Sequence, residues 1–235
     1  MKKLSIIFLF LINFIFTQSG SASLPDLLKN ASIMVGMNQS FYGTGWNELI
    51  KDIRDEGTDV DQNPFRKLNF TLMNEFDAGV LGGLKYVSYG YNIKASDETI
   101  IYNHSSGQYQ SDTEIVEAER ELKFLKLFLT YPLNSGLYIG IEGGYFMEGE
   151  SKNKINNVSD EVEIDRDMWI DDDFLEFDYG LLGQFYYNIN ENMLATIEGY
   201  YGLSKFSEEN IEDDAGIPNV FHYANLGIMY KFGKK

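Results

Sequence analysis

The chain has 235 residues, of which 36 are acidic and 19 basic, so its formal net charge is −17 at pH 7. This acidity argues against nucleic acid and against electrostatic binding to anionic lipid, because both need a basic surface. The absence of cysteine excludes disulfides, thiolate metal sites and a lipid-modified N-terminal cysteine.

The first predicted element is an export signal. Two lysines follow the initial methionine, an apolar run covers residues 4–16, and a small-residue run ends at Ala22. This order is typical of a secretory signal peptide, and the apolar run is shorter than the roughly 20 residues that a membrane-spanning anchor needs. We expect a signal peptide over residues 1–22 and an outer-membrane β-barrel domain over residues 23–235, with 17 basic and 36 acidic residues.

The rest of the chain is predicted to be β structure. The composition favours it, because 16 Tyr and 17 Phe accompany only four Pro. About eight segments alternate with the period of a strand, at residues 31–41, 67–76, 80–94, 115–130, 136–149, 174–188, 192–205 and 219–232. The third segment is the least regular, since Lys85 and residues 86–91 do not divide cleanly between two faces, and we expect a bulge there.

The connections between these segments alternate in length. Residues 77–79, 132–136 and 188–192 are short turns rich in Gly, Asn and Pro. The longer connections are polar and mostly acidic, and they cover residues 42–66, 95–114, 150–173 and 206–218. This alternation predicts an up-and-down meander with both termini on one side, short turns towards the periplasm and long loops outside.

The two faces of each segment differ in polarity. In the last segment an apolar face that ends in aromatics opposes a small and polar one: Val220, Ala224, Leu226, Ile228, Tyr230 and Phe232 against Tyr223, Asn225, Gly227, Met229 and Lys231. The segments that contain Phe70, Ile139, Phe177 and Ile197 repeat this rule. We therefore expect an all-β fold, a single up-and-down antiparallel transmembrane β-barrel of about eight strands with the apolar faces towards lipid.

The ends of the segments supply a second indication. Aromatic residues gather there, as expected for girdles at the two membrane interfaces: Tyr131, Tyr145, Tyr186, Tyr187, Tyr230 and Phe232. Periodicity alone also fits an apolar face turned inwards. A soluble sandwich or a periplasmic lipocalin-like ligand-binding barrel therefore stays an alternative.

The interior of an eight-stranded barrel is just wide enough for its own side chains, which argues against a general porin. The polar faces predict an inward network of Glu75, Lys126, Glu142, Glu176, Asp178, Gln184, Glu198 and Lys231. Because buried charges are costly unless paired, we expect Lys126 and Lys231 to contact carboxylates of this set and to stiffen the barrel. The surplus of carboxylates leaves a proton or ion path as an alternative.

Other candidate sites are weaker. Acidic clusters at residues 165–173 and 208–214 could gather calcium or meet a surface partner, but neither has EF-hand spacing. A lipid-modifying enzyme would need a nucleophile beside His222, where Ala224 stands, and the other histidine, His104, lies in a predicted loop. With no phosphate-binding or zinc motif present, we expect no catalytic residue, metal site or cofactor.

Two stretches resemble known families. Residues 225–232 resemble, at Asn225, Gly227, Tyr230 and Phe232, the C-terminal signal by which bacterial outer-membrane barrels are recognised for assembly. Residues 122–146, an apolar strand, a short turn and a Gly-rich strand, resemble the middle hairpin of small outer-membrane barrels of the PorT-like type. The resemblance implies a Gram-negative outer membrane, the barrel-assembly machinery, and contact with outer-membrane lipid and lipopolysaccharide.

The function expected from the sequence is a structural or surface-interaction role through long acidic loops. A lipid-modifying enzyme built on the same barrel is the alternative from another class.

Overall fold

The structure is a computed structural model, and it describes residues 31–42, 50–51, 53–55, 57–103, 108–156, 158–164, 176–204 and 220–232. The expected signal peptide, His104 and the acidic clusters at 165–173 and 208–214 lie outside the described residues. Within the described ranges, no helix is long and apolar enough to cross a membrane.

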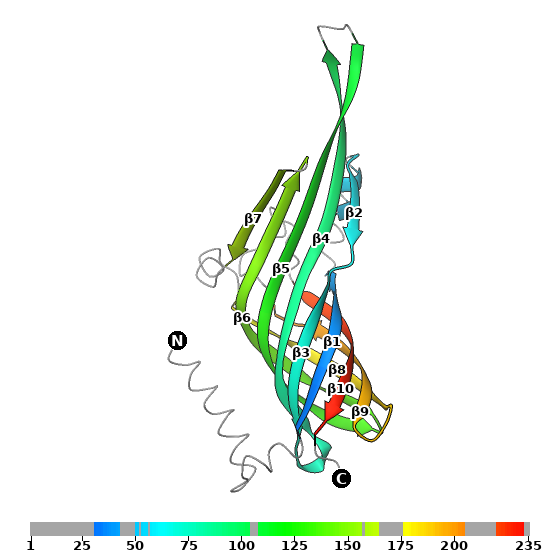
Figure 1. The fold of residues 1–235 in the computed structure, drawn as a ribbon, viewed down its shortest axis with the longest axis vertical. Coiled ribbons are helices and arrows are strands. Elements are labelled where there is room, and N and C mark those ends of the chain that lie inside the picture. The colour runs from blue at the N-terminus through cyan, green and yellow to red at the C-terminus, as the bar shows by residue number, and fades with distance from the viewer. Residues whose placement is uncertain are drawn as a thin grey trace.

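The described part of the chain forms ten β-strands and one short 3-10 turn, Asp77–Gly79, and residues 50–51 and 53–55 are helical (Figure 1). The strands are β1 (Ala31–Tyr42), β2 (Asp59–Asn63), β3 (Arg66–Glu75), β4 (Leu81–Asn103), β5 (Gln108–Asn134), β6 (Leu137–Ile155), β7 (Val158–Ile164), β8 (Phe177–Asn188), β9 (Met193–Gly202) and β10 (Phe221–Lys231).

Eight of these strands close into a ring. Its order is β1, β3, β4, β5, β6, β8, β9 and β10, with every neighbour antiparallel. The pairing of β1 with β10, from Ser32–Lys231 to Tyr42–Phe221, closes the ring. Because ring neighbours follow one another along the chain, the barrel is an up-and-down meander. The predicted antiparallel barrel of about eight strands is confirmed.

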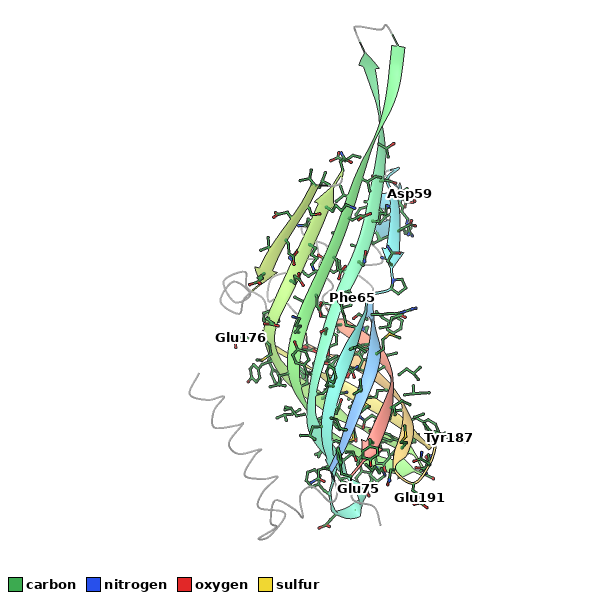
Figure 2. The ribbon with its side chains drawn as sticks, viewed as in Figure 1. Asp59, Phe65, Glu75, Glu176, Tyr187 and Glu191 are labelled. Atoms are coloured by element: carbon green, nitrogen blue, oxygen red, sulfur yellow. The ribbon has the colours of Figure 1, made fainter. Side chains whose placement is uncertain are left out.

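The short connections lie together at one end of the ring, called the lower end below. The 3-10 turn joins β3 to β4, a turn at Ser135 and Gly136 joins β5 to β6, and residues 189–192 join β8 to β9. Gly136 has a φ of 89°, a left-handed conformation that favours glycine in a tight hairpin. Figure 2 shows Glu75 and Glu191 at this end, and β1 begins and β10 ends there (Figure 1).

At the opposite end three strands continue beyond the ring. β4 and β5 stay paired up to Asn103 and Gln108, and β6 pairs with β5 up to Ile155. β2 adds to the edge of β4, and β7 adds to the edge of β6. These segments form the protruding sheet, in the order β2, β4, β5, β6, β7, in the upper half of Figure 1.

The loops predicted over residues 42–66, 95–114 and 150–173 were therefore wrong in large part. Residues 95–103 and 108–114 continue β4 and β5, the end of β6 and β7 occupy residues 150–155 and 158–164, and β2 occupies residues 59–63 of the first range. The prediction depended on polarity, but most residues of the added strand segments are polar or charged on both faces, so they show no continuous apolar face. Its register continues from the ring below it, so polar residues stay in strands.

The apolar face of the ring strands points outwards. Large exposed apolar side chains surround the barrel: Ile33, Val35, Met37, Leu68, Phe70, Leu72, Leu129, Ile139, Ile141, Leu181, Phe185, Ile197, Leu226 and Ile228. In β8 the alternation is direct, since Leu181 and Phe185 are exposed whereas Asp178, Leu182 and Gln184 are buried. This orientation does not fit the soluble sandwich or lipocalin-like alternative, whose apolar faces would lie inside.

Exposed aromatics mark the strand ends at the lower end of the barrel. Four of the predicted girdle residues are exposed there: Tyr131, Tyr187, Tyr230 and Phe232. Tyr145 is half-buried against the ring of Phe177. Tyr186 was wrongly assigned to a girdle, because it is buried inside and packs against Tyr138, with 5.2 Å between ring centroids. Consecutive strand residues face opposite ways, so only Tyr187 of this pair can point outwards.

Above Phe70 the contact between neighbouring strands of the ring changes from backbone pairing to side-chain hydrogen bonds. Backbone pairing of β3 with β4 ends at Phe70–Tyr86. Beyond it the Asn38 side chain donates a hydrogen bond to the Ser88 carbonyl, and the Gly90 amide donates one to Ser40 Oγ at 3.3 Å. Side chains of β1 thus bind the β4 backbone where the strand ladder stops.

Candidate functional site

Buried side chains fill the interior of the barrel. Towards the lower end they are Met34, Met73, Tyr186, Leu194 and Met229, and towards the protruding sheet they are Tyr89, Phe124, Phe146, Tyr200, Phe221 and Tyr223. Five buried charged side chains lie between these two groups: Lys85, Lys126, Glu142, Asp178 and Glu198. We call these five side chains the lumen network.

The lumen network is a continuous series of charges of alternating sign. Glu142 Oε2 lies 2.6 Å from Lys85 Nζ, and Glu142 Oε1 lies 3.4 Å from Lys126 Nζ. Lys85 Nζ is also 3.2 Å from Glu198 Oε2, and Lys126 also binds Asp178. Each lysine therefore lies between two carboxylates, as buried ammonium groups require.

Glu198 lies at one end of the network and is held by neutral donors as well. Gln184 Nε2 and Asn225 Nδ2 each donate a hydrogen bond to its carboxylate at 2.6 Å. Thr130 in turn donates to Gln184 Oε1 at 2.9 Å, which fixes the orientation of the amide. The two amides compensate the burial of a carboxylate that has only one cation beside it.

Hydroxyl groups bind the other two carboxylates. Tyr223 donates to Glu142, with its oxygen 2.9 Å from both carboxylate oxygens, and Ser204 donates to Asp178. The network holds three carboxylates and two ammonium groups, and these donors stabilise the surplus negative charge without a third cation.

The ammonium groups also lie over aromatic rings. Lys126 Nζ is 3.8 Å from the ring centroid of Tyr200 and 4.6 Å from that of Tyr89, and Lys85 Nζ is 5.4 Å from that of Tyr223. Such cation–π contacts stabilise a desolvated cation. Ion pairs, donors and rings together occupy the middle of the lumen.

The structure places five of the eight predicted lumen residues inside the barrel: Lys126, Glu142, Asp178, Gln184 and Glu198. Glu75 does not join them, because it is exposed at the lower end of β3 (Figure 2). Glu176 precedes β8 and is partly exposed, and Lys231 is half-buried at the last position of β10. All three have the inward alternation of their strands. Alternation predicts the face of a residue but not its depth, and these residues lie at the mouths.

Sequence reasoning missed Lys85, which lies at the centre of the network. Its segment carries aromatic and apolar residues on both faces, so no polar face was evident. The expected bulge is absent, since β4 keeps one register with β5 from Leu81 to Asn103, and a bulge occurs instead between Lys123 and Phe124 in the pairing of β5 with β6. The surplus of predicted lumen carboxylates over lysines was the signal that a further buried cation was needed.

The candidate enzyme residue His222 is engaged by its neighbours. Its Nδ1 accepts a hydrogen bond from the Gly202 amide at 3.3 Å, and its ring stacks on Tyr201 with 4.4 Å between centroids. Ala224 lies on the same outward face of β10. Among the residues that the structure describes, no group of three or more His, Cys, Asp or Glu is arranged to hold a metal ion.

The protruding sheet carries a second set of charges, in water. Glu117 of β5 is 3.3 Å from both Lys94 Nζ of β4 and Lys154 Nζ of β6. Hydrogen bonds from these two lysines lower the pKa of the Glu117 carboxyl below its usual value near 4.5. Lys152 of β6 bridges Glu150 and Glu161. Cross-strand pairs of opposite charge thus stabilise a sheet that has little apolar surface.

The sequence of this barrel matches one known protein family. Residues 64–208, more than half of the chain, match the model of the outer membrane protein beta-barrel domain. The chain belongs to this family. The barrel is accordingly an integral protein of the bacterial outer membrane, which agrees with its exposed apolar surface.

Several solved structures of outer-membrane barrels are similar to this chain, all at low sequence identity. Ail, the attachment invasion locus protein of Yersinia pestis, solved with the heparin analogue sucrose octasulfate, is 14% identical with a TM-score of 0.41, over 86% of this chain and 97% of Ail. Neisserial surface protein A is 7% identical with a TM-score of 0.37, and the match covers 86% of this chain and 97% of that protein. OprG from Pseudomonas aeruginosa is 12% identical with a TM-score of 0.34, and the match covers 87% of this chain and 96% of OprG. No curated protein matches the chain.

Proposed function

We propose that this outer-membrane barrel is a closed anchor that presents the protruding sheet outside the cell for interaction, and that it is not a general porin. The observation that carries the proposal is the lumen network, whose lysines and carboxylates have no exposed side-chain surface. An eight-stranded ring leaves room only for its own side chains. A solute crossing it would have to separate these ion pairs and displace the rings packed over them.

The orientation follows from the lengths of the connections. Outer-membrane barrels have short periplasmic turns and longer extracellular segments. The three short turns lie at the lower end and the protruding sheet lies at the other, so the sheet faces outwards from the cell. A rigid barrel that holds exposed, charged strands suits binding to a surface partner.

The remaining expectations belong to the same proposal. Residues 1–22 direct export, and Asn225, Gly227, Tyr230 and Phe232 form the assembly signal read by the barrel-assembly machinery. The exposed pair Tyr230 and Phe232, with 5.2 Å between ring centroids, supports this role at the lower end. The exposed apolar surface contacts outer-membrane lipid and lipopolysaccharide. The resemblance to PorT-like barrels, and contact of the acidic clusters at 165–173 and 208–214 with a cation or surface protein, stay predictions.

The proposal assigns no enzyme activity and no cofactor. A lipid-modifying enzyme would need His222 free to accept a proton from a nucleophile. The hydrogen bond from Gly202 to His222 Nδ1 and the neighbouring Ala224 favour an interfacial role for this histidine instead.

The orientation is tested with single cysteines, since the chain has none of its own. Asp59→Cys lies on the protruding sheet and Glu191→Cys in a lower turn, both exposed (Figure 2). On intact cells a membrane-impermeant maleimide is expected to label the first variant at once and the second only after the outer membrane is permeabilised. Labelling of Glu191→Cys alone on intact cells would contradict the proposed orientation.

The closed lumen is tested by conductance. Purified barrel inserted in planar bilayers is expected to give no stable stepwise currents, whereas a general porin measured alongside gives them. Reproducible open-channel steps from the unmodified barrel would overturn the non-porin assignment.

A further inference from the structure

We propose that the outer edge of β7 is a docking edge, where a basic, extended segment of a partner protein adds to the protruding sheet as a further strand. The inference rests on the proposed function in taking the sheet as the interaction surface. It names the position of the contact and the chemistry of the partner.

The two edge strands of the protruding sheet, β2 and β7, differ in what packs against them. At the β2 edge Arg54 Nε donates a hydrogen bond to the Val60 carbonyl at 3.0 Å. Ile50 and Val60 are buried together, with Ile53 packed against them. The chain before β2 therefore folds back over one face of the β2–β4 pair, where Ile93 and Ala95 of β4 join the cluster, and Arg54 occupies a backbone acceptor of β2, so this edge is less open to another strand.

The β7 edge has no such cover within the described residues. β7 pairs with β6 in an unbroken register from Gly149–Ile164 to Ile155–Val158, and the sheet ends there. Residues 158–163 are all exposed, with Val158 at 74% and Val162 at 39%. The strand contains no proline and no bulge, and the charges that protect its edge are all of one sign, so they repel acidic strands but not basic ones. Its free backbone groups form a regular template for one more strand.

The charge of β7 indicates which strand fits. Asp160, Glu161 and Glu163 are its charged residues, and all are acidic. Among the described residues only Glu161 of these three has an ion pair, with Lys152 Nζ at 3.3 Å. Opposite charges across a strand pair stabilise it, whereas like charges destabilise it. A partner strand that places Lys or Arg opposite the acidic residues and apolar residues opposite Val158 and Val162 is therefore complementary.

The same argument disfavours a second copy of the chain on this edge. Pairing of β7 with another β7 would bring two acidic strands together. Anionic lipid headgroups are disfavoured by the same charge. The fitting occupant is a basic strand from a different protein.

The test uses the purified full chain in detergent and a labelled, end-capped peptide with valine opposite Val158 and Val162 and lysine opposite Asp160, Glu161 and Glu163. Fluorescence anisotropy is expected to show saturable binding. The same peptide with N-methyl groups on alternate residues keeps its charge but loses the backbone donors along one edge, and we expect about tenfold weaker binding. Equal binding of both peptides would show attraction by charge alone and overturn strand addition.

Matched charge reversals locate the contact. Asp160→Lys with Glu163→Lys on β7 is expected to weaken peptide binding about tenfold or more. Asp59→Lys with Asp61→Lys makes the same charge change on the exposed residues of the β2 edge and is expected to leave it unchanged. If the β7 variant does not fold, as judged by its heat-dependent gel mobility, Asp160→Asn with Glu163→Gln replaces it with the same expected direction.

Three results would contradict the proposal: equal effects of the two reversals, no binding to the unmodified chain, and a dimer of the free chain that a Val162→Pro change abolishes. The measurement is made in detergent, so it does not depend on which way the barrel faces. Failure of the cysteine-labelling experiment and failure of peptide binding are thus separate outcomes.

Discussion

Lys85 Nζ lies 2.6 Å from Glu142 Oε2 inside the barrel, and neither side chain has exposed surface. The two residues come from β4 and β6, which are separated in the ring by β5. The ion pair therefore joins strands that share no backbone hydrogen bonds, and it stabilises the closed shape of the lumen as well as its charge.

Glu142 and Glu198, which both form ion pairs with Lys85, are expected to differ in their contribution to stability. Among the three carboxylates of the lumen network only Glu142 contacts both lysines, so Glu142→Gln should lower the free energy of unfolding by about 3–5 kcal/mol. Glu198→Gln leaves Lys85 paired with Glu142 and should cost about 1–3 kcal/mol. Urea titration in lipid vesicles, with folded protein counted by its mobility on an unheated detergent gel, measures both. A larger cost for Glu198→Gln would contradict the central position of Glu142.

Two substitutions of Tyr89 distinguish the contribution of its ring packing from that of its hydroxyl group. Its ring lies 5.3–5.6 Å from those of Phe124, Phe221 and Tyr223, and its hydroxyl has no hydrogen-bond partner among the described residues. Tyr89→Ala should cost about 3–5 kcal/mol by opening a cavity. Tyr89→Phe should be neutral or stabilising, because it removes a buried polar group. The same urea titration checks both, and a cost for Tyr89→Phe near that of Tyr89→Ala would refute this assignment.

The protruding sheet should weaken in acid before the barrel does. The pKa of Glu117 is lowered by its hydrogen bonds from Lys94 and Lys154, so its stabilising effect is present above the pKa of the unfolded chain and is lost as the pH falls through the lower folded pKa. Amide-exchange protection of Val116, corrected for intrinsic rates, should fall below about pH 4. In a Glu117→Gln control this pH dependence should be reduced; an unchanged profile would exclude Glu117 as its source.

Two glycines predict opposite outcomes of the same substitution. A Cβ at Gly144 would lie 2.2 Å from the Leu125 carbonyl oxygen and 2.4 Å from Lys126 Cα, whereas one at Gly199 would meet nothing within 4 Å. Gly144→Ala must therefore shift β5 beside the lumen network and should reduce the folded fraction after refolding into vesicles. Gly199→Ala should refold like the parent. Equal folded fractions would show that the wall at Gly144 yields more easily than its geometry indicates.

The ring was predictable because lipid and lumen impose different chemistry on the two faces of each strand. Leu181 and Phe185 against Asp178 and Gln184 give a pattern that local sequence carries by itself. Lys85 was not found because its neighbours Val87 and Tyr89 pack inside like core residues, so its face carries no polar pattern. Its role depends on carboxylates from β6 and β9 that only the closed ring brings to it.

The protruding sheet was not predictable for a different reason. Asp97 and Glu114 look like loop residues in the sequence, yet they form strand because β4 and β5 continue their pairing from the ring. The pairing register continues from the ring into the protruding sheet. This register and the cross-strand ion pairs determine the structure of the sheet. Neither effect leaves a periodic apolar signal in the sequence.

The central claim is that the apolar faces contact lipid and the polar faces are enclosed, and neighbouring residues of β8 test it most directly. With Trp46 and Trp169 changed to Phe, a single tryptophan is placed at Phe185, which is 41% exposed, or at Tyr186, which is 8% exposed. In vesicles of lipid brominated on the acyl chains, Phe185→Trp is expected to be strongly quenched and Tyr186→Trp to be little affected. Stronger quenching of Tyr186→Trp, or no quenching of either variant, would contradict the account.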